Sequence, residues 1–379
     1  MPTIQVFKIL SIIAFLIPTV LFGADNIQPP DIGARNYLLI DFQSGDELAS
    51  KNADQQIEPA SITKVMTAYV IYQELAKGFI TLDEKVLISK KAWKMEGSRM
   101  FLKPNSKVKL DKLLHGLLIQ SGNDAAVALA EHIAGSEEAF VSRMNVVAKE
   151  LGLNHTHFAN VTGWPATDHY TTANDIAILA RHLITDYPEH YKLYSQKEYT
   201  YNKINQKNRN QLLWKDDTVD GIKTGHTESA GFCLLASAKR NNMRLISVVL
   251  GTNSTKERTA YTQQLLEYGF KHYETHLLYK AGSVLTEAAI WKGDADHVPL
   301  GTTNDLYVTI RKDHYKNLKG VMDIDKGIDA PVTRGDVLGK IKLLVNNEVV
   351  REAPLVAMKN IGEGGSWDRL IDSVKKIFN

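Results

Sequence analysis

The chain lacks several features that would assign it to common classes of protein. Of its 379 residues only Cys233 is a cysteine, so no disulfide can form within one chain and no cysteine-based metal site is visible. Basic and acidic residues nearly balance, giving a formal net charge of +2 without a long basic block. Nucleic-acid binding therefore has little support. Cys233 itself lies in an apolar, strand-like run and is expected to be a small core residue.

Long apolar runs are also scarce, and the one at the N-terminus is short for a membrane span. It extends from Ile9 to Phe22, follows the positive charge of Lys8, and is followed by the small residues Gly23 and Ala24. This order is typical of a secretory signal. We therefore predict that residues 1–24 are a signal peptide, with an uncleaved N-terminal anchor as the alternative.

Strand-like and helical patterns alternate through residues 25–274. Strands are predicted at 36–41, 47–50, 219–225, 231–240 and 243–251. Helices are predicted at 61–78, 111–120, 123–133, 136–152, 172–184 and 258–273. Strands at both ends of a helical middle predict an α+β domain in which the two ends share one antiparallel sheet.

The composition changes near residue 275. Short strand-like runs at 306–311, 337–345 and 349–356 alternate with turn signals, which predicts a small all-β domain over 275–360, called here the β-rich domain. A glycine-rich break at 362–365 then precedes a segment with Trp367, Leu370 and Val374 at helical spacing. We predict an amphipathic helix over 361–379 that lies in a membrane interface, or else packs on its own domain or a partner.

Three short strings carry the chemistry: Ser61-Ile-Thr-Lys64, Ser121-Gly122-Asn123 and Lys223-Thr224-Gly225. A Ser-x-x-Lys pair also begins at Ser106 and at Ser373, but only the pair at Ser61 opens a long apolar helix and has the other two strings downstream. The ordered combination is far more specific than any one of its parts. It matches the S-x-x-K, S-x-N and K-T-G set of serine acyl-transfer enzymes.

The first string is suited to a nucleophile and its base. Residues i and i+3 share one face of a helix, so Ser61 and Lys64 should lie together at the helix start. A serine hydroxyl needs a base to become a good nucleophile, and a lysine can act only when it is neutral. The apolar neighbours of Lys64 should lower its pKa by burial, and a nearby Lys223 would push in the same direction.

The chain resembles the D-alanyl-D-alanine carboxypeptidases of the peptidase S11 type, which are low-molecular-mass penicillin-binding proteins. The resemblance extends from the N-terminal signal to the final helix, and it implies a serine β-lactamase/DD-peptidase-like fold, an antiparallel sheet with a helical subdomain. It implies an acyl-enzyme on Ser61, with Lys64 as the base and Ser121 relaying a proton to the leaving amine and linking Lys64 with Lys223. It implies neither a metal nor an organic cofactor.

The resemblance also implies the residues that bind the substrate, which are Asn123, Lys223, Thr224, Gly225, His226 and Arg258. Thr224 would bind the substrate carboxylate, and the backbone N–H groups of Ser61 and His226 would form an oxyanion hole. Arg258 would orient the same carboxylate, with an ordinary surface arginine as the alternative. His169, in the loop that borders the site, is expected to be structural.

The implied partners are a peptidoglycan stem peptide as substrate, β-lactam inhibitors, and a membrane surface bound through the C-terminal helix. The implied location is the periplasm, peripherally attached to the outer face of the inner membrane. A serine β-lactamase is one alternative, because Glu150 and Asn154 have the spacing of a deacylating pair, although Glu150 ends a helix close after Ser121. A non-catalytic cell-wall-binding protein is another, against which the intact motifs argue.

Overall fold

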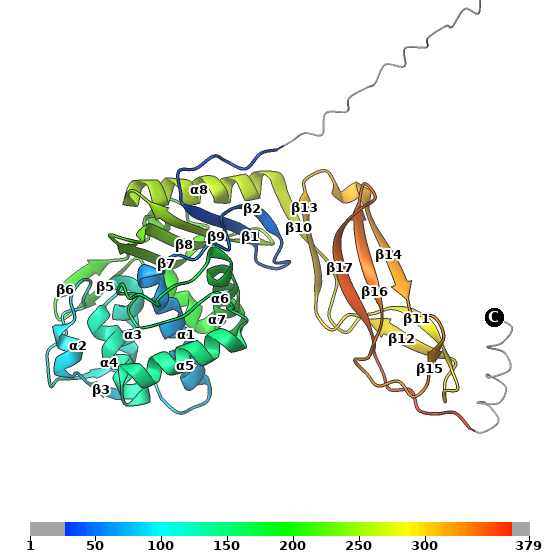
Figure 1. The fold of residues 1–379 in the computed structure, drawn as a ribbon, viewed down its shortest axis with the longest axis horizontal. Helices are drawn as coiled ribbons and strands as arrows, with labels where there is room; N and C mark the ends of the chain where they lie inside the picture. The colour runs from blue at the N-terminus through cyan, green and yellow to red at the C-terminus, as the bar shows by residue number, and fades with distance from the viewer. Residues whose placement is uncertain (1–26, 366–379) are drawn as a thin grey trace, which may run out of the picture.

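The computed structural model describes residues 27–365, so the predicted signal peptide and residues 366–379 of the predicted C-terminal helix lie outside the described residues. The start of that helix, predicted at residue 361, is wrong, because Ile361 and Glu363 form β-bridges to Val332 and Gly293 and Ile361 belongs to the core of the β-rich domain. A part built of a sheet and helices occupies one side of Figure 1, and an elongated part built of strands extends from it on the other side. The predicted fold class, an α+β domain followed by a small all-β domain, is confirmed for the described residues.

The first part is organised around a five-stranded sheet in the order β2-β1-β9-β8-β7. Its strands are β1 (Asn36–Asp41), β2 (Glu47–Lys51), β7 (Val219–Thr227), β8 (Gly231–Arg240) and β9 (Met243–Thr252). The N-terminal β1 pairs antiparallel with β9, from Asn36 opposite Leu250 to Asp41 opposite Leu245. The two ends of this domain therefore share one sheet, as predicted, and β7 is left with a free edge.

Helices cover both faces of this sheet (Figure 1). The helix α8 (Thr255–His272) packs on one face, and α1 (Thr63–Ala76) and α6 (Ala173–Asp186) lie on the other side, with α3 (Leu110–His115), α4 (Asn123–Ala134) and α5 (Glu137–Glu150) beyond them. Short helices α2 (Lys90–Lys94) and α7 (Pro188–Tyr191) complete the set. Because side chains alternate along a strand, Leu38 of β1 joins one core and Leu39 joins the other.

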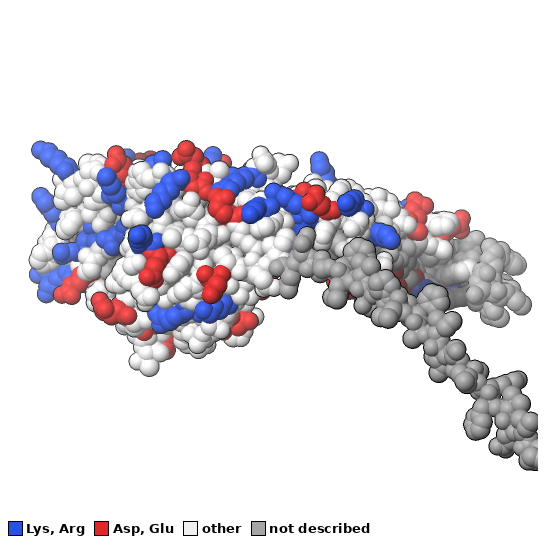
Figure 2. Space-filling model, turned by 90° about the horizontal axis from the view of Figure 1, so that it is seen from above, with Lys and Arg blue, Asp and Glu red and all other residues white. Residues whose placement is uncertain are grey.

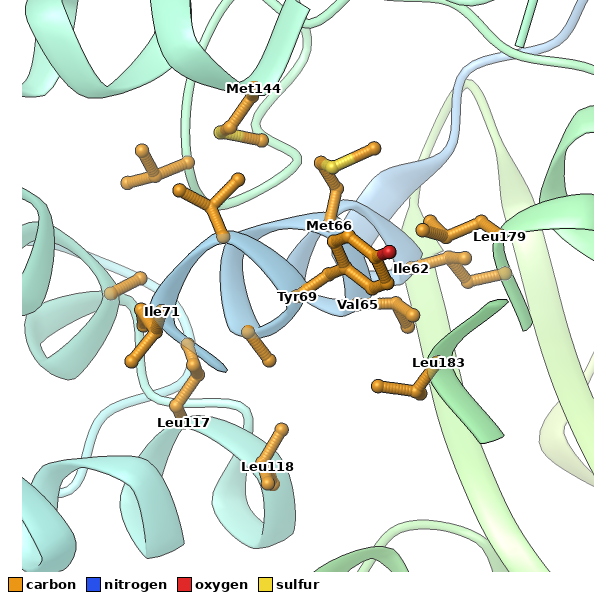
Figure 3. Packing of buried hydrophobic residues seen from close by; sticks show 14 of the residues in the cluster. Ile62, Val65, Met66, Tyr69, Ile71, Leu117, Leu118, Met144, Leu179 and Leu183 are labelled. Carbon is orange, nitrogen blue, oxygen red and sulfur yellow. The ribbon is translucent and has the colours of Figure 1, made fainter. Parts of the chain in front are cut away.

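The helix α1 is buried on all sides, which is why its sequence is apolar almost throughout. Figure 3 shows Val65, Met66 and Ile71 packed among side chains from neighbouring elements, which include Leu117, Leu118, Met144, Leu179 and Leu183. The chain enters this helix through a 3-10 turn over Ala60–Ile62. The segment that carries Ser61 and Lys64 is thus fixed by packing before any substrate arrives.

Several element boundaries differ from the prediction. The helix predicted at 111–120 is α3 followed by a π-helical turn over Gly116–Gln120, after which Ser121 is left-handed with φ of 64°. The helix predicted from residue 258 begins at Thr255, because the Ser254 side chain caps it by accepting from the Glu257 N–H.

Two short hairpins were not predicted. They are β3 (Lys85–Leu87) with β4 (Lys107–Lys109), and β5 (Glu198–Tyr201) with β6 (Ile204–Lys207). Their strands are three or four residues long and mostly polar. They therefore lack the run of alternating apolar residues on which a strand prediction depends.

The β-rich domain begins without a linker, since α8 ends at His272 and β10 starts at the next residue. Here β10 (Tyr273–Tyr279) pairs with β13 (Leu306–Arg311). A six-stranded sheet has the order β14-β16-β17-β12-β11-β15, formed by β11 (Val284–Trp291), β12 (His297–Gly301), β14 (Leu318–Ile324), β15 (Ile328–Asp329), β16 (Val337–Val345) and β17 (Glu348–Ala357). Alternate residues of β16, including Ile341 and Leu343, point into its apolar core.

Polar contacts join the two domains at the turn between β1 and β2. Arg351 of β17 donates to Asp46 Oδ1 at 2.9 Å and to the Ser44 carbonyl at 2.9 Å. Thr275 donates to Asp41 Oδ2 at 2.7 Å, and the hydroxyls of Ser44 and Thr309 are 2.7 Å apart. The joint is therefore made by specific hydrogen bonds and not by the chain connection alone.

Charged residues of both signs are interspersed over the face seen in Figure 2. This agrees with the near balance of basic and acidic residues in the sequence. None of the helices within residues 27–365 has the length and apolar character that crossing a membrane requires.

Candidate active site

The three strings of the sequence analysis meet at one cavity beside the free edge of β7. The cavity has a volume of about 1110 Å³ and is lined by Ser61, by Ser121 and Asn123, and by Thr224 and Gly225. They come from the turn before α1, from the junction of the π-helical turn with α4, and from β7. Residues far apart in the sequence are therefore brought to one surface.

Lys64 is the most constrained side chain of this cluster. It is 0% exposed, and its Nζ donates to Ser61 Oγ at 3.0 Å, to Asn123 Oδ1 at 2.7 Å and to the Thr162 carbonyl at 2.6 Å. Three acceptors match the three donors of a lysine ammonium group. The nitrogen is thus held at hydrogen-bond distance from the Ser61 hydroxyl, where a general base must lie.

The surroundings of Lys64 favour its neutral form. Burial and then the positive charge of Arg209 lower its pKa from 10.5, Asp124 opposes both effects, and the resulting pKa is about 7. A substantial fraction of the side chain is therefore neutral near pH 7. The sequence analysis expected Lys223 to be the neighbouring cation and did not foresee Arg209; the repulsion between Lys64 and Lys223 is present and lowers the pKa of Lys223.

Lys223 and Ser121 form a second buried pair. Lys223 Nζ donates to Ser121 Oγ at 2.9 Å and to the Thr224 carbonyl at 3.0 Å. Burial, followed by the charge of Lys64, holds the pKa of Lys223 well below its usual value. The expected link from Ser121 to Lys64 is not made directly, because within residues 27–365 the hydrogen bonds of Lys64 go to other partners.

Asn123 begins α4 and is fixed at both ends of its amide. Its carbonyl oxygen accepts from Lys64, and its Nδ2 donates to the Glu96 carbonyl at 2.6 Å. Its backbone N–H donates to the Ser98 carbonyl at 2.7 Å. Asn123 therefore ties the base to the loop over residues 96–98, which borders the cavity at Gly97 and Ser98.

Gly225 allows β7 to approach the turn that carries Ser61. A Cβ at this position would lie 3.0 Å from the Ala60 Cβ and 3.1 Å from the Pro59 carbonyl oxygen, which is tighter than ordinary packing. The next residue, His226, is exposed at the cavity, and its ring lies against Phe232 with the centroids 3.9 Å apart. Any larger residue than glycine at 225 would push the strand away from Ser61.

Arg258 is a buried residue, which excludes the surface-arginine alternative. It is 5% exposed and lines the cavity, and its Nη1 donates to the Gly225 carbonyl at 3.0 Å. Its Nε is buried without a hydrogen-bond partner among the described residues. Burial lowers its pKa to about 10. A buried guanidinium without a carboxylate is suited to binding an anion that enters the cavity.

The sequence analysis did not single out Arg209 or Trp214, although both line the cavity together with Trp164. Trp164 belongs to a loop that was recognised, and it follows Gly163, which has φ of 86° and whose backbone lies against the Ala60 carbonyl. Arg209 and Trp214 lie between β6 and β7, in a segment without a recognisable pattern. No sequence signal was available for these two.

His169 and Glu150 do not take part in the chemistry. His169 is buried, its Nε2 hydrogen-bonds the Thr63 hydroxyl at 2.8 Å, and burial lowers its pKa to about 4, so it is a neutral structural residue. Glu150 lines a separate groove together with Glu74 and Arg143. It therefore cannot serve as a deacylating base for Ser61, and the β-lactamase-like spacing is coincidental.

Comparison with known proteins gives consistent results for the whole described chain. The profile of the D-alanyl-D-alanine carboxypeptidase family, peptidase S11, matches residues 24–254, and that of the penicillin-binding protein 5 C-terminal domain matches residues 273–363. The D-alanyl-D-alanine carboxypeptidase DacC of Escherichia coli (strain K12) is 41% identical over 370 residues, which cover 96% of this chain and 92% of that protein.

Solved structures agree with the sequence relatives. Penicillin-binding protein 5 from Haemophilus influenzae superposes with a TM-score of 0.87 at 42% identity, covering 89% of this chain and 99% of that one. Penicillin-binding protein D2 from Listeria monocytogenes in its ampicillin-bound form superposes with a TM-score of 0.60 at 28% identity, covering 64% of this chain and 100% of that one. The similarity thus includes both domains in the first case and about two thirds of the chain in the second.

Proposed function

Since this chain belongs to the D-alanyl-D-alanine carboxypeptidase family, peptidase S11, we propose that it removes the terminal D-alanine from peptidoglycan stem peptides through an acyl-enzyme on Ser61. The single observation that supports this most strongly is the contact between Lys64 Nζ and Ser61 Oγ at 3.0 Å. The lysine is buried and its pKa is lowered to about 7, so it is an effective base at neutral pH.

In the first step neutral Lys64 accepts the proton of the Ser61 hydroxyl, and Ser61 Oγ bonds to the carbonyl carbon of the penultimate D-alanine. The carbonyl oxygen takes up negative charge, which the backbone N–H groups of Ser61 and His226 stabilise. The substrate lies along the free edge of β7 and pairs with its backbone.

In the second step the C–N bond breaks, and the amine of D-alanine receives the proton that Lys64 took from Ser61, relayed by the Ser121 hydroxyl, which contacts Lys223. The carboxylate of the leaving D-alanine is bound by Thr224, by the Lys223 amine as a hydrogen-bond donor and by the guanidinium of Arg258. Water then attacks the ester and releases the shortened peptide from Ser61. Asn123 holds Lys64 in place through both steps.

We propose that β-lactams acylate Ser61 as mimics of the same substrate, which the similarity to a penicillin-binding protein in an ampicillin-bound form supports. We assign residues 25–272 to the catalytic domain, 273–365 to the β-rich domain and 366–379 to a membrane-anchoring helix. With the signal at 1–24, this organisation supports a periplasmic enzyme attached peripherally to the outer face of the inner membrane.

The test is release of D-alanine from Nα,Nε-diacetyl-L-Lys-D-Ala-D-Ala by the purified protein, with Ser61→Ala as the control. We expect release by the wild type and a loss of at least about a thousandfold in the variant, as for removal of a nucleophile that acts as part of a unit. Benzylpenicillin should label the wild type and not Ser61→Ala.

The same preparations distinguish the alternatives. Rapid hydrolysis of benzylpenicillin without D-alanine release would identify a serine β-lactamase instead. A folded wild-type protein that neither releases D-alanine nor binds benzylpenicillin would contradict the proposal and favour a non-catalytic cell-wall-binding protein.

A further inference from the structure

The direction of the substrate along β7 follows from the chemistry of the proposed function, on which this inference rests. Lys223 and Ser121 serve the leaving D-alanine, and the backbone of His226 serves the carbonyl that is attacked. Along β7, Lys223 therefore lies beside the leaving group of the substrate, and His226 lies beside its acyl group. A peptide paired antiparallel with β7 continues, on its N-terminal side, past the end of the strand.

A β-paired chain advances about 3.3 Å per residue, so the residue before D-Ala-D-Ala lies beside the segment just after His226. That segment is Thr227 and Glu228, where β7 ends and turns toward β8. Glu228 is exposed and lines the same cavity as Ser61. Within residues 27–365 its carboxylate forms no hydrogen bond or ion pair.

A second carboxylate reinforces the negative charge at this end. Glu58 Oε2 accepts hydrogen bonds from the hydroxyls of Ser229 and Thr227, which flank Glu228. Glu58 lines the adjoining pocket, which shares Pro165 with the catalytic cavity.

Two cations of the cavity, Arg209 and Arg258, are associated with the other end, although Lys207 and Lys215 also line the cavity and Arg35 donates to the Ser229 carbonyl at 2.8 Å. Arg209 acts electrostatically on Lys64, Lys223 and Arg258, the groups around the nucleophile and the leaving carboxylate. Arg209 and Arg258 thus belong to the end of the cleft that takes the carboxylate, whereas the carboxylates of Glu228 and Glu58 lie beside the residue that precedes D-Ala-D-Ala.

We propose that Glu228 determines specificity by binding the amino group of a cationic side chain on the residue that precedes D-Ala-D-Ala. The enzyme would therefore prefer stem peptides with a free amine on a diamino acid at this position over those in which the amine is blocked or consumed in a cross-link. Glu228 takes no part in bond breaking and acts on binding.

The test compares two peptides that differ only at this amine, Nα-acetyl-L-Lys-D-Ala-D-Ala and its Nα,Nε-diacetyl form, with the full-length protein. For the wild type we expect kcat/KM for the free-amine peptide to exceed that for the diacetyl peptide by about two- to fivefold, the range of an exposed ion pair. The difference should lie in KM and should shrink at about 1 M salt, where the Debye length is short.

The ratio of the two kcat/KM values should fall to about 1 in Glu228→Gln and below 1 in Glu228→Lys. Glu348→Gln is the matched control, because it removes an equally exposed carboxylate from the distant β17 and should leave the ratio at the wild-type value. A wild-type ratio of 1, or a ratio that Glu228→Gln does not change, would overturn the inference and leave Glu228 an ordinary turn residue.

Failure of this inference differs from failure of the proposed function. If the wild type releases D-alanine from both peptides at equal rates, the carboxypeptidase activity stands and the role of Glu228 falls. If neither peptide releases D-alanine, the proposed function itself fails. Benzylpenicillin labelling of Glu228→Gln reports whether that variant is folded. If the variant is not folded, the inference is still tested by the salt dependence of the ratio of the two kcat/KM values in the wild type.

Discussion

The interiors of the two domains are built from different side chains. The core of the catalytic domain includes buried charged groups, among them Lys64, Asp124, Lys223 and Arg258. In the described part of the β-rich domain the only buried polar side chain is Thr302, and the core consists of Ile, Leu, Val and Ala. The core of the β-rich domain is thus almost entirely apolar, whereas the core of the catalytic domain also encloses charged groups.

The difference has a physical meaning. A buried charge that lacks a counter-charge is unfavourable and persists only where the surrounding structure holds it in place. In the catalytic domain these groups surround the cavity beside β7, where a neutral lysine and an unpaired guanidinium are useful for acyl transfer. The described residues of the β-rich domain hold no such cluster, so we expect substitutions in its core to leave the rate of acyl transfer unchanged.

The largest expected effect comes from removing the base. Lys64→Met keeps a side chain of similar length in an apolar site and should reduce kcat/KM for D-alanine release by about 10²- to 10⁴-fold. The melting temperature should change little, because two effects on stability oppose each other. The variant no longer buries an amine, which is favourable, but it leaves the acceptors of Asn123 and Thr162 unpaired, which is unfavourable. Activity within tenfold of the wild type would show that Lys64 is not the base.

The opposite result is expected in the β-rich domain. Ile341→Ala removes a fully buried side chain and should lower the free energy of unfolding of that domain by about 2–5 kcal/mol, measured by urea denaturation. Below the transition, kcat/KM should stay within twofold of the wild type. Val65→Ala is the control in the catalytic core, where a smaller cavity beside Lys64 should affect both stability and rate.

The acid limb of the pH profile gives a smaller, graded effect. Because burial lowers the pKa of Lys64 to about 7, kcat/KM should rise about tenfold per pH unit below that value and level off above it. An unfolded lysine keeps a pKa near 10.5, so the unfolded state binds more protons between these values and this group's contribution to stability rises with pH there.

Arg209→Met tests the cause of that pKa. Removal of the neighbouring positive charge should move the midpoint of the acid limb to a higher pH. A midpoint that stays in place would show that burial alone sets the pKa of Lys64. Kinetics of benzylpenicillin acylation, followed from pH 5 to 9, would provide the measurement.

Much of this organisation could be predicted because it depends on local patterns. The apolar run of β1, the apolar run of α1 and the ordered motifs each leave a signature in a short window of sequence. The shared sheet followed from strands at both ends of the domain. The functions of Ser61, Lys64 and Lys223 followed from the resemblance to a family and not from any spacing alone.

What could not be predicted depends on contacts between distant segments. Arg209 affects Lys64 only because an irregular segment between β6 and β7 folds over the cavity. The burial of Arg258 depends on β7 and β8, to whose carbonyls it donates. The contact of Arg351 with Asp46 likewise joins residues that no local pattern relates.

That contact supports the smallest expected effect, at the joint between the two domains. Arg351→Met removes the hydrogen bonds to Asp46 and to the Ser44 carbonyl, and for a half-exposed ion pair this should cost about 0–1 kcal/mol. Hydrogen exchange should quicken in the turn over residues 41–46, while kcat/KM stays unchanged.

Lys340→Met breaks a comparable pair with Glu352 inside the β-rich domain and should leave the turn unaffected. If Arg351→Met instead lowered kcat/KM, the β-rich domain would influence the active site, and the expectation that substitutions in this domain leave the rate of acyl transfer unchanged would be wrong.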